Sequence, residues 1–362
     1  MTLEEKVGQL CCFGWHGRAA LDDQARFCVQ ELHAGGMIVM GRNLHDTSQK
    51  PVPHIDAVAV RAMLDELQNL ACTPLLIATD QEGGRVARFG TVPFTRMPAA
   101  AALTTPEEAY RAAYQTGLEL RCVGVNTNFA PVADINSNPT NPVIGDRSFG
   151  ATVTEVVPFV EAQVRGYGAA GMLACLKHFP GHGDTATDSH YALPILQHTL
   201  QTMQSRELVP FRAGIAAGVP VVMTAHILFP ALDTEVPATM SHAILTGLLR
   251  ETLGFGGLII TDCLEMKAVA EGWGTAQAAL AAIKAGADMV LVCHTLERQK
   301  ETYETLLAAA RSGALPRARL DEAVAHVQAA KANLSSLPFD PVLLGGRRHE
   351  QAVTTLGADA PR

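Results

Sequence analysis

The sequence predicts an α/β protein built as a single (β/α)8 TIM-type barrel. Eight short apolar runs alternate with longer amphipathic segments between Val7 and Arg311, as expected for repeated strand and helix units. The runs are apolar throughout, which is typical of parallel strands covered on both faces. An open doubly wound sheet is the alternative. Against it, no G-x-G-x-x-G turn follows the first run and no phosphate loop occurs elsewhere.

The expected elements follow in order along the chain. The eight apolar runs are Val7–Gly14, Gly36–Met40, Leu75–Thr79, Thr127–Pro131, Leu173–Lys177, Val221–Thr224, Leu258–Thr261 and Asp288–Val292. Segments with helical periodicity are Asp22–His33, Ile55–Leu70, Pro106–Val123, Val153–Ala170, Leu200–Ala217, Ser241–Leu253, Thr275–Ala285, Thr295–Arg311 and a final Leu320–Leu334. Several of them are closed by glycine, which favours helix ends. We expect one barrel domain over residues 1–335 and a polar tail over residues 336–362.

Composition limits the partners. The net charge of −8 and the absence of a basic stripe argue against nucleic acid and anionic membranes. The first fifteen residues lack a cationic start and an apolar run, so we expect no signal peptide, no membrane span and a cytoplasmic location. Eight scattered cysteines without a CxxC pair are expected to be reduced thiols. We also expect a monomer.

Polar residues gather where the predicted strands end. Five successive strands run into Asp80, Asp134, Lys177-His178, His226 and Asp262. In a (β/α)8 barrel these ends share one open mouth, where reactive residues belong. We therefore expect carboxylates, a lysine and histidines to converge on one rim, which five chance strand ends would not explain.

The stretch from Lys177 to His190 is the most informative segment of the chain. Its glycines and proline exclude a regular helix or strand, so it is a long loop with three histidines and two aspartates. Asp188 and His190 are two residues apart, so the carboxylate can orient the imidazole and raise its pKa. Such a pair suits a group that acts as acid and then as base. The alternative interpretation is a hydrogen bond between the two side chains that only stabilises the loop.

Asp262 follows the buried run Leu258–Thr261, so a rigid element holds its carboxylate at the mouth. A fixed aspartate suits covalent attack on an anomeric carbon. A lone aspartate at a strand end more often caps the next helix, and only the neighbouring strand-end residues favour the catalytic interpretation.

At these residues the sequence resembles family 3 glycoside hydrolases, and within them the β-N-acetylglucosaminidases that recycle cell-wall fragments. The resemblance covers roughly residues 1–300. It rests on the stretches MTLEEKVGQL, ATDQEGGRVARF, NFAPVADINSNPTNPVIGDRSFG, LKHFPGHGDTATDSHYALP and GLIITDCLEM. It implies a retaining β-N-acetylhexosaminidase that removes terminal β-linked N-acetylglucosamine, with muropeptide-like fragments as substrates and neither metal nor organic cofactor.

The resemblance also implies roles for single residues. Asp262 is then the nucleophile, His190 the acid/base and Asp188 its partner. The residues expected around the non-reducing sugar are Asp80, Arg88, Arg147, Lys177 and His178. Carboxylate acceptors and cationic donors fit the hydroxyl and acetamido groups of such a sugar.

Two positions depart from the pattern or lack a role. Cys263 stands where this branch often has Asp or Ser after the nucleophile; an inert buried thiol is expected, and the alternative is a thiol that alters the pKa of Asp262 or can be oxidised. His182 has no assigned role beyond ordering the loop.

Three other functions stay open at this point. Phosphate can replace water as acceptor, because a neutral histidine repels anions less than a carboxylate would. A metal-dependent hydrolase would use His178, His182 and His190 as ligands, although Lys177 would repel the cation. A sugar-binding barrel without turnover is the third, but binding alone needs no nucleophile and proton shuttle.

Overall fold

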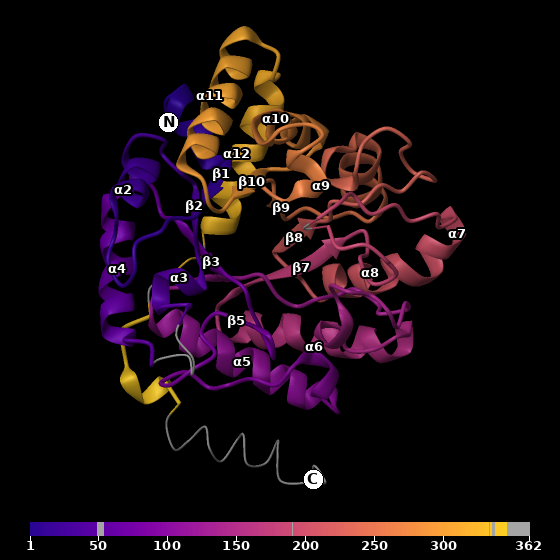
Figure 1. The fold of residues 1–362 in the computed structure, drawn as a ribbon, viewed down its shortest axis with the longest axis horizontal. Coiled ribbons are helices and arrows are strands. Elements are labelled where there is room, and N and C mark those ends of the chain that lie inside the picture. Colours follow the sequence, from indigo (N-terminus) through magenta and orange to yellow (C-terminus); the bar gives the residue numbers. More distant parts are fainter. Residues whose placement is uncertain (49–53, 190, 333, 335–336, 346–362) are drawn as a thin grey trace.

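The computed structural model describes residues 1–48, 54–189, 191–332, 334 and 337–345. Eight parallel strands close into a barrel in the order β1, β10, β9, β8, β7, β6, β3, β2, and helices surround them (Figure 1). Closure is made by the first and last strands, where Cys11 pairs with Val290 and Phe13 with Val292. The predicted (β/α)8 barrel is confirmed.

The barrel strands lie where the apolar runs predicted them, with shifted ends. They are β1 Cys11–Phe13, β2 Gly36–Val39, β3 Leu76–Thr79, β6 Thr127–Asn128, β7 Leu173–Phe179, β8 Val221–Thr224, β9 Leu258–Cys263 and β10 Met289–Val292. A small hairpin of β4 Gln81–Gly83 and β5 Val86–Ala87 follows β3. Strand β7 is two residues longer than expected, so it carries His178 and Phe179 as well as Lys177 within the strand.

The first predicted strand was partly wrong, because Val7 and Gln9 belong to helix α1, Leu3–Gln9. Thr2 and Glu5 form a capping box: Glu5 N donates to Thr2 Oγ1 at 3.1 Å, and Thr2 N donates to Glu5 Oε2 at 2.7 Å. This reciprocal cap satisfies two free donors and starts a helix. The strand therefore begins only at Cys11.

Most of the remaining helices match the amphipathic segments. The helices after α1 are α2 Asp23–Gln30, α3 Gly41–Leu44, α4 Ala57–Leu70, α5 Pro106–Cys122, α6 Val153–Ala169, α7 Leu200–Thr202, α8 Leu208–Ala216, α9 Lys267–Ala270, α10 Thr275–Ala285, α11 Leu296–Ser312 and α12 Arg317–Lys331. Helices α3 and α9 had no predicted counterpart, and the predicted helix Leu200–Ala217 is divided into α7, a π-helical segment and α8. Two segments are π-helical, η3 Met203–Glu207 and η5 Ala243–Thr252, and short 3-10 turns are η1 Ala100–Ala102, η2 Gly145–Arg147, η4 Ala238–Met240 and η6 Pro341–Leu343.

Helix α12 closes the N-terminal end of the barrel. Val327 is fully buried in the cluster that fills the barrel interior, and Leu334 packs against the same cluster. Lys331 is buried beside it, and its Nζ donates to Gln9 Oε1 at 2.6 Å. The opposite end of the barrel, at the C-terminal ends of the strands, contains a cavity.

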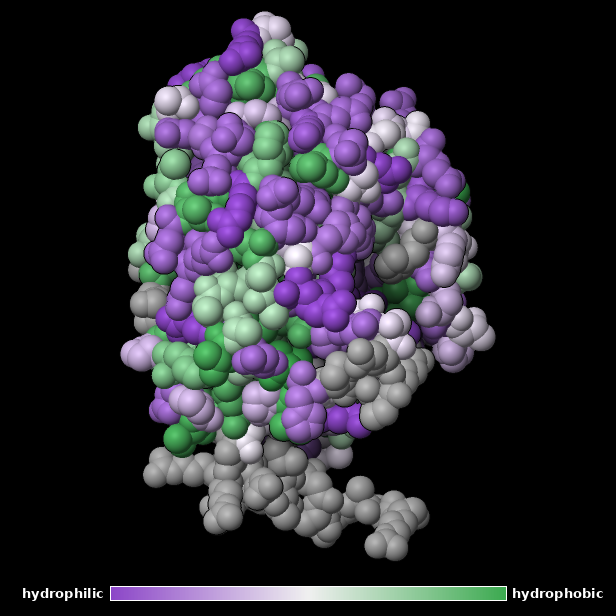
Figure 2. Space-filling view, turned by 60° about the vertical axis from the view of Figure 1, so that its left-hand side comes forward, coloured by the Kyte–Doolittle hydropathy of each residue, from purple (hydrophilic) through white to green (hydrophobic). Residues whose placement is uncertain are grey.

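Hydrophilic side chains cover most of the face shown in Figure 2, with smaller apolar patches between them. Among the described helices, none combines the length and the apolar character that crossing a membrane requires. Of the predicted tail, residues 337–345 lie against the barrel helices, where Gly345 N donates to Glu119 Oε1 of α5 at 3.2 Å. Residues 346–362 lie outside the described part of the chain.

Candidate active site

A cavity of about 550 Å³ opens at the C-terminal ends of the strands. Its walls come from the ends of β2, β3, β6, β7, β8, β9 and β10 and from the loops that follow them. Polar strand ends therefore converge on one rim, as the sequence predicted. The site residues that line the cavity are Asp80, Arg88, Arg147, Lys177, His178, Asp188 and Asp262.

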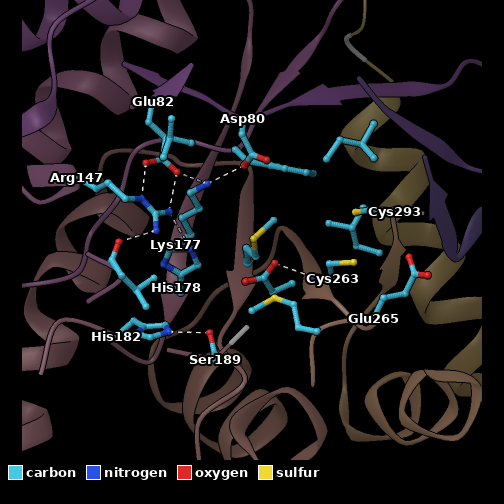
Figure 3. A pocket seen from close by; sticks show the side chains of 18 of the residues that line it. Asp80, Glu82, Arg147, Lys177, His178, His182, Ser189, Cys263, Glu265 and Cys293 are labelled. Atoms are coloured by element: carbon cyan, nitrogen blue, oxygen red, sulfur yellow. Dashed lines mark hydrogen bonds and ion pairs between the residues drawn. The ribbon is translucent and has the colours of Figure 1, made fainter. Parts of the chain in front are cut away.

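A buried ion network forms one wall of the cavity (Figure 3). Lys177 Nζ lies 2.9 Å from Asp80 Oδ1 and 2.6 Å from Glu82 Oε1. Arg147 grips Glu82 with two parallel bonds, Nε to Oε2 and Nη2 to Oε1, both 2.8 Å. Two cations thus face two carboxylates, and the bidentate pair fixes their mutual orientation.

The network keeps both carboxylates ionised. Burial alone would raise the pKa of Asp80 and of Glu82, but the ammonium of Lys177, with Arg88 or Arg147, holds each pKa well below its usual range. Burial would lower the pKa of Lys177, yet Asp80 and Glu82 raise it. The wall therefore offers fixed charges that can orient the hydroxyl groups of a polar ligand.

Arg88 follows the β4–β5 hairpin and carries an unused donor. Its Nη2 lies 3.4 Å from Asp80 Oδ2, while its buried Nε has no hydrogen-bond partner among the residues that the structure describes. A buried donor without a partner is costly, so this atom favours a ligand that accepts a hydrogen bond.

The carboxylate of Asp134 fixes the position of His178. The carboxylate of Asp134 is fully buried and lies 2.7 Å from His178 Nδ1, while it accepts His178 N at 3.2 Å and His182 N at 2.7 Å. The pKa of Asp134 is lowered against the opposing effect of burial, chiefly by His178. Arg147 Nη2 lies 3.4 Å from the other ring nitrogen. Both ring nitrogens of His178 therefore have protein neighbours.

Asp262 projects from the end of β9 into the cavity. Its Oδ1 accepts Cys263 N at 2.7 Å. Burial would raise the pKa of Asp262, but His226, His178 and the Cys263 N–H lower it, so the group is a carboxylate at neutral pH. His226 is itself fixed, with Nδ1 2.8 Å from Thr239 Oγ1 and Nε2 3.0 Å from the carbonyl of Cys263.

The long loop after β7 returns to the cavity at its end. His182 is buried, with Nδ1 2.8 Å from Thr185 Oγ1 and Nε2 3.1 Å from Ser189 Oγ (Figure 3). Burial lowers the pKa of His182 to about 4, so the ring is neutral and orders the loop. Asp188 and Ser189 line the cavity, whereas the predicted acid/base His190 lies outside the described residues.

Three residues of the site were visible in the sequence but given no role there. They are Glu82, Asp134 and His226, which hold Arg147, His178 and the Asp262 segment respectively. A signal existed only for Glu82, which stands two residues after Asp80; the pairings of Asp134 and His226 depend on contacts between strands.

The ring nitrogens of His178 and His182 are engaged by Asp134, Thr185 and Ser189. Although the two rings are neighbours, with centroids 5.7 Å apart, these nitrogens are therefore already occupied and not free to bind the zinc ion of the metal-hydrolase alternative. A fixed carboxylate opposite a charged, hydroxyl-binding wall is instead suited to nucleophilic attack on a bound sugar.

Comparisons with known proteins agree with this geometry. The family described as glycosyl hydrolase family 3 N terminal domain matches residues 2–330. Beta-hexosaminidase A of Pseudoalteromonas piscicida is 36% identical over 360 residues, 92% of this chain and 59% of that protein. The beta-hexosaminidase of Methylococcus capsulatus is 40% identical over 295 residues, 80% of this chain and 84% of that protein.

Among solved structures, a family 3 β-N-acetylglucosaminidase from Paenibacillus sp. str. FPU-7 superposes with a TM-score of 0.90 at 42% identity. It covers 98% of this chain, and this chain covers 68% of it. The chain thus spans 59% of the length of the Pseudoalteromonas relative and about two thirds of the Paenibacillus one. The resemblance to family 3 glycoside hydrolases of the β-N-acetylglucosaminidase branch is confirmed, and the chain belongs to glycosyl hydrolase family 3.

Proposed function

We propose that the protein is a retaining β-N-acetylhexosaminidase that removes terminal β-linked N-acetylglucosamine from glycosides. The observation that carries the proposal is the ionised Asp262 at the end of β9, in the same cavity as the Lys177 network. The names of the relatives, beta-hexosaminidase and β-N-acetylglucosaminidase, support the choice of sugar.

In the first step, Asp262 attacks the anomeric carbon and forms a glycosyl ester, while His190 donates a proton to the leaving oxygen. Because Cys263 N–H holds Oδ1, Oδ2 is the attacking oxygen. Asp80 and Arg88 would hold sugar hydroxyls, and the buried Nε of Arg88 gains the acceptor it lacks. Attack by a positioned carboxylate divides one difficult displacement into two.

In the second step, neutral His190 takes a proton from water, and the hydroxide oxygen displaces Asp262 from the sugar. Asp188 orients the imidazole in both steps. Two inversions at one carbon give a product with retained β configuration. Phosphate in place of water would release a sugar 1-phosphate, and the neutral histidine favours this variant of the reaction.

For the biological setting we propose cytoplasmic turnover of muropeptide-like cell-wall fragments by a monomeric enzyme. The support for this setting is the resemblance to cell-wall-recycling enzymes, together with the acidic composition. It is separable from the chemistry, which any soluble β-N-acetylglucosaminide tests.

The test compares a chromogenic β-N-acetylglucosaminide with the matching β-glucoside. The proteins are the wild type, Asp262→Ala, His190→Ala and, as a control, Glu304→Ala, which removes an exposed carboxylate of α11. Each is assayed with and without chelator and with and without phosphate. Azide is added to Asp262→Ala, because a small anion can enter the space left by the carboxylate.

We expect the wild type and Glu304→Ala to cleave the acetamido sugar, regardless of chelator, and to release the β-anomer first. Asp262→Ala should lose turnover, and azide should restore it with an α-glycosyl azide as product. Full activity of Asp262→Ala would refute the nucleophile, and an α-anomer from the wild type would refute retention. If sugar 1-phosphate is the product when phosphate is present, the reaction is phosphorolysis and not hydrolysis.

A further inference from the structure

Three potential metal ligands outside the sugar-binding set meet on another side of the cavity. They are the thiols of Cys263 and Cys293 and the imidazole of His294, and one ligand atom from each lies within 4.8 Å of the others. All three line the cavity. Figure 3 shows the two cysteines on the same side, away from the Lys177 network.

Strand pairing explains why these residues meet. Cys263 ends β9 and pairs with Leu291 of β10, so Cys293, two residues further on, reaches the same rim. The cysteines are 8% and 3% exposed, whereas His294 is exposed. The pKa of the Cys293 thiol is raised, first by its hydrogen bond with Cys263 and then by burial. The two thiols are thus buried neighbours, and the third ligand of the group, His294, is exposed.

The segment that carries His294 is fixed by Glu265. Its carboxylate accepts His294 N at 2.6 Å and Thr295 N at 3.0 Å. Arg42 Nη1 lies 3.1 Å from His294 Nδ1, so one ring nitrogen already has a neighbour. The backbone that positions the three ligand atoms is therefore held, and within the described part of the chain the other ring nitrogen of His294 makes no hydrogen bond.

We propose that Cys263, Cys293 and His294 form a binding site for a thiophilic divalent cation of the zinc and cadmium class. Thiolate sulfur and imidazole nitrogen are the ligands that such ions prefer. In a tetrahedral zinc site the ligand atoms lie about 3.5 to 3.8 Å apart, so small side-chain rotations close the present spacing. The fourth position faces the cavity. As two metal–sulfur bonds form, both thiol protons leave to solvent.

A cation at this site inhibits the enzyme, a consequence that rests on the proposed function. The backbone N–H of Cys263 holds the nucleophile Asp262, so metal binding at Cys263 acts one residue from the attacking carboxylate. The ion also occupies cavity volume, and its positive charge lowers the nucleophilicity of the carboxylate that must attack the sugar. Inhibition should therefore follow occupancy of the thiol site.

The experiment separates metal binding from catalysis. Metal-free protein, kept reduced with a phosphine, is titrated with cadmium while thiolate-to-metal charge-transfer absorption in the ultraviolet is recorded. The variants are Cys293→Ser and His294→Gln, and Cys72→Ser is the matched control, since Cys72 is a free, exposed cysteine that precedes β3. His294→Gln changes an exposed side chain, so it serves if Cys293→Ser does not fold.

We expect one equivalent of cadmium to bind the wild type and Cys72→Ser with the thiolate band. Since loss of a partner that only orients a ligand weakens binding about 10- to 100-fold, losing a ligand in Cys293→Ser or His294→Gln should cost at least about tenfold. The concentration of zinc that halves activity should rise in parallel. Binding unchanged in both variants, or lost in Cys72→Ser, would overturn the site. A thiol site that binds normally in a protein without glycosidase activity would instead contradict the proposed function alone.

Discussion

Replacing Lys177 by Met should destabilise the protein strongly at neutral pH. Lys177 is 2% exposed, and its ammonium is within 2.9 Å of both Asp80 and Glu82. Methionine has a similar length but no charge, so it leaves two buried carboxylates beside one another with less compensation. Breaking a buried ion pair in this way typically costs about 3 to 5 kcal/mol. That is a large part of a total stability of about 5 to 15 kcal/mol.

The loss should depend on pH with a definite sign. In the wild type, the lowered pKa values of Asp80 and Glu82 contribute stability above the ordinary carboxyl range of about 4, and this contribution is lost only in stronger acid. Without Lys177 both pKa values rise, and protonation relieves the repulsion. The deficit of Lys177→Met should therefore be greatest at pH 7 to 8 and shrink towards about pH 5.

The assay is urea unfolding, followed by circular dichroism and tryptophan fluorescence to check that both report one transition. Lys284→Met, at an exposed position of α10, is the control and should change stability by less than about 0.5 kcal/mol. Adding Asp80→Asn to Lys177→Met should recover at least about 1 kcal/mol, because one unpaired charge is removed. A loss below about 1 kcal/mol, equal at pH 5 and pH 8, would refute the electrostatic account of this wall.

Three further predictions concern other parts of the molecule and the sugar site. Burial raises the pKa of Glu207 to about 7 although Arg206 opposes the shift, so the free energy of unfolding of the wild type should fall by up to about 3 kcal/mol between pH 4.5 and pH 8. Glu207→Gln should remove this dependence, and the same pH profile of unfolding in both proteins would contradict the prediction. A Cβ at Gly183 would lie 1.7 Å from Ile135 O, so Gly183→Ala should lower activity and cost about 1 to 3 kcal/mol of stability. Gly168 in α6 has open space around it, so Gly168→Ala should stabilise the protein by about 0.5 to 1 kcal/mol. Thermal melts that rank the two variants the other way would contradict the packing of the loop. Arg88→Met should lower kcat/KM about 10- to 100-fold through lost charged hydrogen bonds without a large change in melting temperature, and unchanged kinetics would remove Arg88 from the sugar site.

The fold was largely predictable from the sequence because each strand is a separate apolar run. Val221–Thr224 and Thr275–Ala285 were predicted to the residue. The start of the first strand failed where two signals compete, since Val7 continues an apolar run but the capping box at Thr2 makes it helical. The capping box is a local signal in the sequence, and here it outweighs the apolar run. The π-helical turns of η3 and η5 depend on packing and have no comparable signal.

The predicted site residues within the described chain line one cavity. Their positions could be predicted without distances, because residues at the C-terminal ends of barrel strands all lie at the same mouth. Pairing across the barrel was less predictable. Lys177 and Arg147 were expected to contact sugar, yet both also neutralise Glu82, which is nearly a hundred residues from Lys177 along the chain. The contact of Cys263 with Cys293 likewise follows from strand register, which a single sequence does not reveal. The roles assigned to the site residues, His190 included, stay predictions.

The pairing of β1 with β10 determines when the barrel can close during synthesis of the chain. Cys11 pairs with Val290, a separation of 290 − 11 = 279 residues. At about 5 to 20 residues per second, a ribosome needs roughly 15 to 55 s to supply the missing neighbour. During that interval one edge of β1 has no strand beside it, and α12, which caps the interior, is made later still. The barrel therefore cannot close until most of the chain has been made, and unpaired strand edges in such an interval favour aggregation.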